Sequence, residues 1–188
     1  RELLRLLPAF AFAGIFVRIY NAVDSILLGL LADTVAVGLY SVPAKVVTAL
    51  QMLIPGAFVA SIYPAMSHYF KTSRASLEDL FIRSMAYLAV LVFPLTVGLF
   101  VLIPNILSRV WPEYLAVTDT FLVMTLALPF LFFSFPTGYC LNAVDAQKKN
   151  TMNRGIITAL NIILNLALIP TLGVFGAGIS FLITNMAL

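Results

Sequence analysis

Long apolar runs separated by short polar gaps dominate the chain. A helix needs about 20 apolar residues to cross the hydrocarbon core of a bilayer. Five runs meet that length and a sixth begins; together they cover residues 8–31, 35–66, 80–108, 114–144, 151–170 and 174–188. Each gap contains at least one of Asp, Ser, Pro, Asn or Gly, which favour turns. The pattern therefore predicts an all-α, integral membrane six-helix bundle.

The basic residues alternate between the two ends of these predicted helices. The N-terminal segment, the second gap and the fourth gap, with the residues just beyond them, carry Arg1, Arg5, Lys71, Arg74, Arg83, Lys148, Lys149 and Arg154. The first and fifth gaps carry none, and the third carries only Arg109. Eight basic residues thus lie on one side and one on the other. Because cytoplasmic loops are enriched in Lys and Arg, we expect the N-terminus to be cytoplasmic and the helices to alternate in direction.

Two features predict that the spans are not straight. Proline occurs inside them at positions 43, 55, 94, 129 and 136, and each proline removes a backbone hydrogen bond and tends to kink its helix. The second and fourth spans also exceed 30 residues, or about 45 Å at 1.5 Å per residue. They must tilt, bend or extend beyond the bilayer.

The first span contains polar residues that are costly in a membrane. Its sequence FVRIYNAVDSILLG (16–29) includes Arg18, Asn21, Asp24 and Ser25. At 100° per residue these four lie within an arc of about 120°, and the two charges each oppose insertion by roughly 2.5 to 3.5 kcal/mol. The stripe therefore either lines a water-filled cavity or binds an ion, or it joins neighbouring helices as a neutralised polar seam.

Two other spans add polar side chains. Lys45, in the second span, either extends to the outer interface or faces a cavity. If Arg18 and Lys45 face one chamber, it is net cationic and suits an anionic substrate, such as one that carries phosphates. In the fifth span Arg154, Thr158, Asn161 and Asn165 fall within about 60° of one another. This seam either hydrogen-bonds to another helix or lines a cavity.

Composition excludes several classes of protein. Hydrophobic residues make up 62% of the chain and charged residues 10%, whereas soluble domains are about 25% charged. The net charge of +3 is spread along the chain, which argues against nucleic acid as a partner. The single Cys140 excludes an internal disulfide framework, and the single His68 excludes a histidine-cluster metal site. No catalytic motif is present, so we expect no enzyme and no resident cofactor.

The ends of the sequence indicate a fragment. The chain starts without Met, and it stops at Met186-Ala187-Leu188 within an apolar run. We expect a piece of a longer membrane protein whose last helix is truncated. The alternative is a complete small protein with a short last helix.

Three segments form a recognisable series along the chain: DSILLGLLADTVAVGLYSVPAKVVTAL (24–50), SIYPAMSHYF (61–70) and NIILNLALIPTLGVFGAGISFLITN (161–185). Together they resemble the polysaccharide-type flippases of the multidrug/oligosaccharidyl-lipid/polysaccharide exporter superfamily. In that family the Ile-Pro-x-x-Gly-x-x-Gly-Ala signal, here Ile169 to Ala177, lies between the fifth and sixth helices of the second lobe. The resemblance implies that residues 1–188 form the carboxy-terminal lobe of a two-lobe transporter.

The resemblance also implies a function. Similar proteins move lipid-linked oligosaccharides across the cytoplasmic membrane of prokaryotes by alternating access. It suggests a polyprenyl-diphosphate-linked glycan as substrate, Arg18 as the contact for its diphosphate, and Asp24 as the acid coupled to Na⁺ or H⁺. From the polar stripe and the possible cationic chamber, Asn21 and Lys45 are the other expected substrate-binding residues. Membrane lipids and an amino-terminal lobe of the same chain would be the partners. The alternatives are a cation-coupled multidrug exporter of the same superfamily and a membrane-embedded glycan enzyme, for which Asp33, Glu113 and Asp119 form no evident motif.

Overall fold

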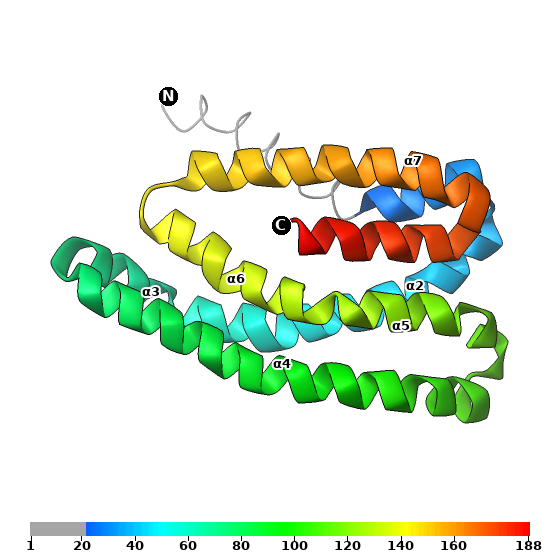
Figure 1. The fold of residues 1–188 in the computed structure, drawn as a ribbon, viewed down its shortest axis with the longest axis horizontal. Coiled ribbons are helices and arrows are strands. Elements are labelled where there is room, and N and C mark those ends of the chain that lie inside the picture. Colours follow the sequence, from blue (N-terminus) through cyan, green and yellow to red (C-terminus); the bar gives the residue numbers. More distant parts are fainter. Residues whose placement is uncertain (1–21) are drawn as a thin grey trace, which may run out of the picture.

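The computed structural model describes residues 22–188, so Arg18 and Asn21 lie outside the described residues. Within this range the regular structure is helical (Figure 1). The elements are the helix Ala22–Leu31, α2 (Thr34–Gln51), the π-helix Met52–Gly56, α3 (Ala57–Thr72), α4 (Arg74–Val110), a 3₁₀ helix (Pro112–Val117), α5 (Thr118–Leu126), α6 (Leu128–Ala143) and α7 (Gln147–Met186).

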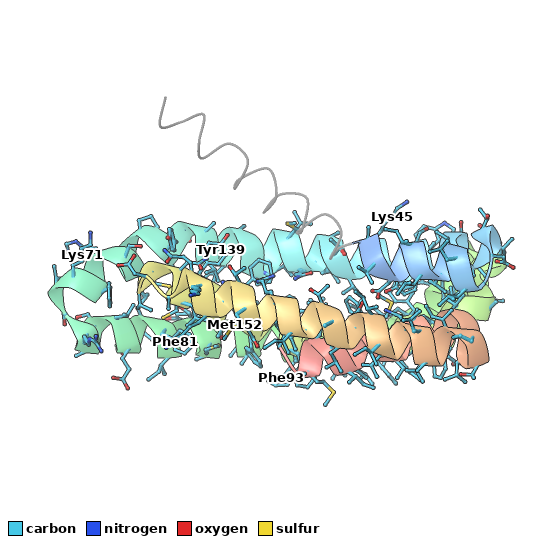
Figure 2. All side chains as sticks on the ribbon, turned by 90° about the horizontal axis from the view of Figure 1, so that it is seen from above. Lys45, Lys71, Phe81, Phe93, Tyr139 and Met152 are labelled. Atoms are coloured by element: carbon cyan, nitrogen blue, oxygen red, sulfur yellow. The ribbon has the colours of Figure 1, made fainter. Side chains whose placement is uncertain are left out.

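Four of the described helical stretches are long and apolar enough to cross a membrane. They are Thr34–Thr72, Arg74–Val110, Pro112–Ala143 and Gln147–Met186, with 39, 37, 32 and 40 residues. A 37-residue helix is about 55 Å long at 1.5 Å per residue, well beyond a hydrocarbon core of about 30 Å. Large apolar side chains such as Val90, Phe93 and Val97 are exposed on the outer face of α4, and Figure 2 shows Phe93 projecting away from the bundle. This surface suits lipid as the solvent.

Side-chain caps begin two of the helices. The Asp33 carboxyl accepts a 2.7 Å hydrogen bond from the backbone N–H of Ala36 at the start of α2. The Ser73 hydroxyl accepts a 3.2 Å bond from the N–H of Ser76 at the start of α4. Each cap satisfies an N–H group that has no partner inside the helix. Both lie in gaps that the turn signals predict, but α4 begins six residues before the expected span of 80–108 because Ser73 supplies this cap.

Pro55 lies in the π-helix, between α2 and α3. Proline has no N–H to donate to the preceding turn, and its ring crowds the carbonyl four residues earlier. The helix widens here over Met52–Gly56 and then resumes as α3. The expected span of 35–66 is therefore one continuous helical path with a local distortion at its centre.

The expected span of 114–144 is divided in the structure. A 3₁₀ helix starts at Pro112, α5 follows, and α6 begins after Ala127 with Pro129 in its first turn. Proline is favoured there because the N–H groups of a first helical turn have no intrahelical acceptor. The position of Pro129 thus accounts for a helix boundary within a continuous apolar run.

α7 reverses direction at Gly173. Its φ of 57° and ψ of −132° are costly for residues with a Cβ atom. Figure 1 shows the two arms of α7 lying side by side in opposite directions. Any side chain at Gly176 would collide with the carbonyl of Leu168, and the Asn153 side-chain amide donates a 3.1 Å hydrogen bond to the Leu188 carbonyl. The two arms cover the expected spans 151–170 and 174–188.

The connections between helices lie at two ends of the bundle. Figure 1 places the α3–α4 turn and the α6–α7 connection at one end, and the start of α2, the α4–α5 connection and the Gly173 kink at the other. The basic gaps that contain Lys71, Arg74, Lys148 and Lys149 therefore share one end, as the alternation of charges predicts.

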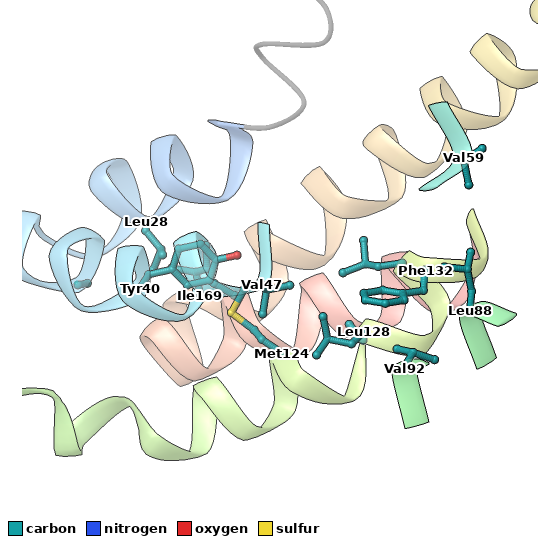
Figure 3. Close-up of a cluster of buried hydrophobic side chains, with 14 residues drawn as sticks. Leu28, Tyr40, Val47, Val59, Leu88, Val92, Met124, Leu128, Phe132 and Ile169 are labelled. Carbon is teal, nitrogen blue, oxygen red and sulfur yellow. The ribbon is translucent and has the colours of Figure 1, made fainter. Parts of the chain in front are cut away.

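The largest core cluster lies where the helix Ala22–Leu31, α2 and α7 meet α4, α5 and α6 (Figure 3). Its fully buried side chains include Leu28, Val47, Leu88, Met124 and Phe132. Tyr40 belongs to the same cluster and is the member with a polar group at its tip. A buried hydroxyl needs a hydrogen-bond partner, and the partner of the Tyr40 hydroxyl belongs to the candidate site described below.

Candidate functional site

Asp24 joins three helices through two short hydrogen bonds. One carboxyl oxygen, Oδ2, accepts a 2.8 Å bond from the hydroxyl of Tyr40 on α2. The other, Oδ1, accepts a 2.7 Å bond from the side-chain amide of Asn165 on α7. The sequence patterns identified Asp24 and Asn165 as polar positions in separate spans, and the structure brings them together. The helix Ala22–Leu31 is thereby connected to α2 and to the first arm of α7.

Asn161 extends this polar network by one helical turn. The Asn165 amide nitrogen also donates a 3.0 Å bond to Asn161 Oδ1, since residues four apart lie on the same helix face. Both N–H bonds of the amide are thus used. The reverse orientation of the Asn165 amide would direct its oxygen at two other acceptor oxygens, so the network itself determines this orientation.

Two buried side-chain oxygens have no hydrogen-bond partner among the described residues. They are Oδ1 of Asn165 and Oγ of Ser180, and both residues are fully buried. Ser180 lies on the second arm of α7, and Asn165 lies on the first. Unpaired buried oxygens are rare in proteins, so both positions stand out within the core.

A cavity of about 410 Å³ adjoins the network. Its wall includes Asp24, Tyr40 and Asn161, and it continues along α2 past Thr48 and Gln51 to Met52 in the π-helix. The rest of the lining includes side chains of α6 and of both arms of α7, namely Leu131, Ser134, Phe135, Arg154, Phe181, Thr184 and Asn185. The cavity therefore combines a carboxyl group, a guanidinium group, amides, hydroxyls and aromatic rings.

The seam on α7 serves two structural roles. Asn165, at one end, is buried and bonds to another helix, whereas Asn161 and Arg154 line the cavity. Thr158 is buried between them, and its hydroxyl donates a 2.7 Å bond to the Arg154 carbonyl within its own helix. Helix packing and cavity lining, the two interpretations left open by the sequence, both occur on this one face.

Lys45 lies apart from this cavity. Its side chain is exposed on α2, and Figure 2 shows it projecting outward from the bundle. Its predicted role in substrate binding therefore does not involve the cavity described above. Arg18 and Asn21, the other predicted substrate contacts, lie outside the described residues.

Several site residues were absent from the sequence-based selection. The most important is Tyr40, the hydrogen-bond donor to Asp24. Its signal was its position within the Gly38-Leu39-Tyr40-Ser41 element of the first resembling segment. Thr184 and Asn185 also line the cavity, and both fall at the end of the third segment. Among residues 22–188 no group of three or more His, Cys, Asp or Glu side chains could hold a metal ion. A cation at this site would therefore depend on amide, hydroxyl or carbonyl oxygens together with Asp24.

Comparison with known proteins yields two matches. Residues 1–70 match the family model described as polysaccharide biosynthesis protein. Over 169 residues the chain is 30% identical to the probable flippase AglR of Haloferax volcanii. The aligned region covers 88% of this chain and 35% of the relative. The chain thus spans about a third of the length of that curated relative. No solved structure matches significantly.

The apolar helices and these matches agree with each other. The four long apolar stretches in residues 22–188, together with the family match, describe a multi-pass membrane protein. The relative's name is that of a transporter rather than of an enzyme. The matched residues 1–70 include Asp24 and Tyr40, which are hydrogen-bonded to each other in the polar network. The chain is thus similar to the polysaccharide biosynthesis family over residues 1–70 and to a relative named as a probable flippase over 169 residues.

Proposed function

We propose that this segment is one lobe of a flippase that moves lipid-linked oligosaccharide or polysaccharide precursors across the cytoplasmic membrane by alternating access. The second lobe would be another part of the same protein. The relative named as a probable flippase supports this function. The cavity beside Asp24 supports a transport mechanism, because substrate sites of such transporters lie within the membrane between helices that move relative to one another.

The hydrogen bonds of Asp24 carry the proposal. One carboxyl group holds two other helices, through Tyr40 at 2.8 Å and Asn165 at 2.7 Å. A proton or Na⁺ that binds this carboxyl group competes with those bonds. A ligand that prefers one arrangement of the helices shifts the equilibrium between the arrangements. Asp24 is thus placed to couple ion binding to movement of the helix Ala22–Leu31 against α2 and α7.

An unpaired oxygen beside Asp24 favours a cation at this place. Asn165 Oδ1 has no partner among the described residues, and it belongs to the side chain that bonds to Asp24. The amide oxygen and the carboxyl group are hard oxygen ligands of the kind that Na⁺ requires. Proton coupling would use the carboxyl group alone. Ion dependence of transport separates these two forms of the proposal.

A multidrug exporter coupled to cations is the competing function. Its cavity would need to attract cationic substrates. Here Arg154 lines the same cavity as Asp24, and its positive charge opposes a cationic substrate while it favours an anionic one. The guanidinium group of Arg154 therefore supports a substrate with an anionic group, such as the lipid-linked glycan, while the carboxyl group of Asp24 in the same lining balances its charge.

Transport by the intact protein in proteoliposomes tests the function. A fluorescent lipid-linked oligosaccharide is incorporated, and the fraction that reaches the outer leaflet is followed with a membrane-impermeant quencher at several Na⁺ concentrations and pH values. Asp24→Asn should slow transport at least tenfold and abolish its response to the coupling ion. Asp145→Asn is the matched control, because Asp145 is exposed in the α6–α7 connection and Asn tolerates its positive φ of 59°.

Two results would contradict the proposal. Absence of transport by the wild-type protein would refute the flippase function. An unchanged response of Asp24→Asn to Na⁺ and pH would remove its coupling role.

Arg18 stays a predicted contact for the diphosphate, and Arg18→Ala should abolish transport while the protein still inserts into the membrane.

A further inference from the structure

A surface pocket of about 560 Å³ lies between α3 and α4, close to the turn that joins them. Its lining comes from these two helices and consists of Tyr69, Ala75, Ser76, Asp79, Leu80 and Arg83. Among residues 22–188, α6 and α7 contribute nothing to this lining. In Figure 1 the α3–α4 turn also lies farther out than the α6–α7 connection at the same end of the bundle. The pocket is therefore open to the surroundings of the bundle.

The walls of the pocket belong to a well-packed helical hairpin. Ser73 is the single residue between α3 and α4. Its N–H donates to the Tyr69 carbonyl at 2.8 Å, and its hydroxyl accepts a 2.9 Å bond from the Ser76 hydroxyl. Met66 and Leu77, from the two helices, are buried together in a small core cluster. These contacts fix the shape of the pocket before any ligand binds.

Two exposed aromatic residues on α4 and directly after it indicate where the membrane interfaces lie. Tyr87 is 59% exposed and Trp111 is 46% exposed, and both residue types favour the interfaces. The stretch between them is about 36 Å long at 1.5 Å per residue. A hydrocarbon core is about 30 Å thick, and about 40–45 Å with the headgroups included. Arg83, one helical turn beyond Tyr87, therefore lies at the depth of the lipid phosphates.

The outer face of α4 is apolar on the membrane side of the pocket. At 100° per residue, Arg83, Val90 and Val97 lie within about 40° of one another. Val90 and Val97 are exposed, and Figure 2 shows Phe93 projecting outward from the same helix. A hydrocarbon chain that runs from the pocket into the membrane therefore meets a continuous apolar surface.

The pocket contains one acid and one base. Arg83 Nε donates a 2.8 Å hydrogen bond to Asp79 Oδ2, and the two terminal nitrogens of the guanidinium and the carboxylate Oδ1 take no part in that bond. The other charged residues of this hairpin, Lys71, Arg74 and Glu78, lie outside the lining. The pocket is thus neutral overall and presents both charges. Because an exposed ion pair contributes little free energy, a ligand that bears both charges can bind to it at small cost.

We propose that this pocket binds a phospholipid whose headgroup carries both a phosphate and a primary ammonium group, as phosphatidylethanolamine does. Along the axis of α4, Arg83 lies about 6 Å nearer to the membrane centre than Asp79. The phosphate, which is attached to the glycerol, meets Arg83, and the ammonium group beyond it meets Asp79. Hydrogen bonds between charged partners are strong, so the two ends of the headgroup are recognised separately. The site lies on the outside of the bundle and does not depend on the proposed transport function.

Lipid binding to the intact, delipidated protein in detergent tests this site. The probes are dioleoyl-phosphatidylethanolamine, dioleoyl-phosphatidylcholine and dioleoyl-phosphatidylglycerol, each titrated by native mass spectrometry. The wild type should bind the ethanolamine lipid at least fivefold more tightly than the choline lipid, because a quaternary ammonium group has no N–H to donate to Asp79. Arg83→Gln should weaken all three lipids at least fivefold, since each carries a phosphate. Lys71→Gln, which removes an exposed charge outside the lining, should change these affinities less than twofold.

Variants of the acid separate recognition of the ammonium group from binding of the phosphate. Asp79→Asn should bind the ethanolamine and choline lipids equally, whereas Glu78→Gln, at the neighbouring exposed acid, should keep the wild-type preference. Asp79→Arg combined with Arg83→Asp keeps an ion pair but reverses its order along α4, so this double variant should also lose the preference. Thermal unfolding of each purified variant in the same detergent confirms that it is folded. Transport in membranes of phosphatidylcholine alone does not report on this site.

Specific outcomes overturn the inference. Equal affinity of the wild type for the ethanolamine and choline lipids refutes recognition of the ammonium group. Tighter binding of the glycerol lipid than of the other two refutes a site for a headgroup with both charges. Equal binding by the wild type and Arg83→Gln refutes the phosphate contact. A loss of preference in Glu78→Gln as large as that in Asp79→Asn refutes the pocket as the place where the ammonium group binds.

Discussion

Asp24 and Asp79 each accept short hydrogen bonds, yet they lie in opposite environments. Asp79 accepts a 2.8 Å bond from Arg83 one turn along α4, where the two side chains are 59% and 65% exposed. Asp24 has no cationic partner among the described residues and bonds to a hydroxyl and an amide from two other helices. Exposed ion pairs contribute little because water solvates both charges. Neutral donors inside a membrane protein can position a carboxyl group and still leave it available to an ion.

Removal of the amide donor is the strongest test of this difference. Asn165→Leu deprives Asp24 and Asn161 of the same donor, and we expect a loss of about 1–3 kcal/mol in the free energy of unfolding. Reversible unfolding in mixed micelles measures it. Asn105→Leu is the matched control, because Asn105 is exposed and bonds only to the Val101 carbonyl of its own helix. Equal losses of unfolding free energy in the two variants would show that the network around Asp24 adds nothing to stability.

Removal of the Tyr40 hydroxyl should have a smaller effect. Tyr40→Phe keeps the ring in the core and deletes one donor to Asp24, for an expected loss of about 0.5–1.5 kcal/mol. The same variant should shift the Na⁺ or pH dependence of transport, because Asp24 loses a competing bond. Tyr87→Phe, at an exposed position on α4, is the control for unfolding and for transport. If transport by Tyr40→Phe depends on Na⁺ and pH as the wild type does, the Tyr40–Asp24 bond takes no part in ion coupling.

The exposed pair should give the smallest effect. Asp79→Asn removes the charge partner of Arg83, and we expect no measurable change in unfolding or in transport, because both side chains are solvated. Measurements at low and high salt check the result. A loss as large as that of Tyr40→Phe would break the comparison between the two carboxyl groups.

Sequence patterns were sufficient for the regular parts of the fold. The apolar runs and gaps predicted where the long helices lie, and the basic gaps predicted which connections share an end of the bundle. The polar positions in the first and fifth spans also led to Asp24, Asn161 and Asn165. These properties follow from residues near one another in the sequence, so a helix-by-helix analysis detects them.

The sequence by itself determined that the chain is a set of apolar helices with a few costly polar side chains. Tertiary structure decided which of those side chains meet: Tyr40 with Asp24, Asn165 with Asp24, and Arg154 with the space beside Gly138. It also placed Lys45 on the outer face, away from the cavity. The physical reason is that hydropathy and periodicity are local, whereas a hydrogen-bond partner depends on which faces of distant helices pack together.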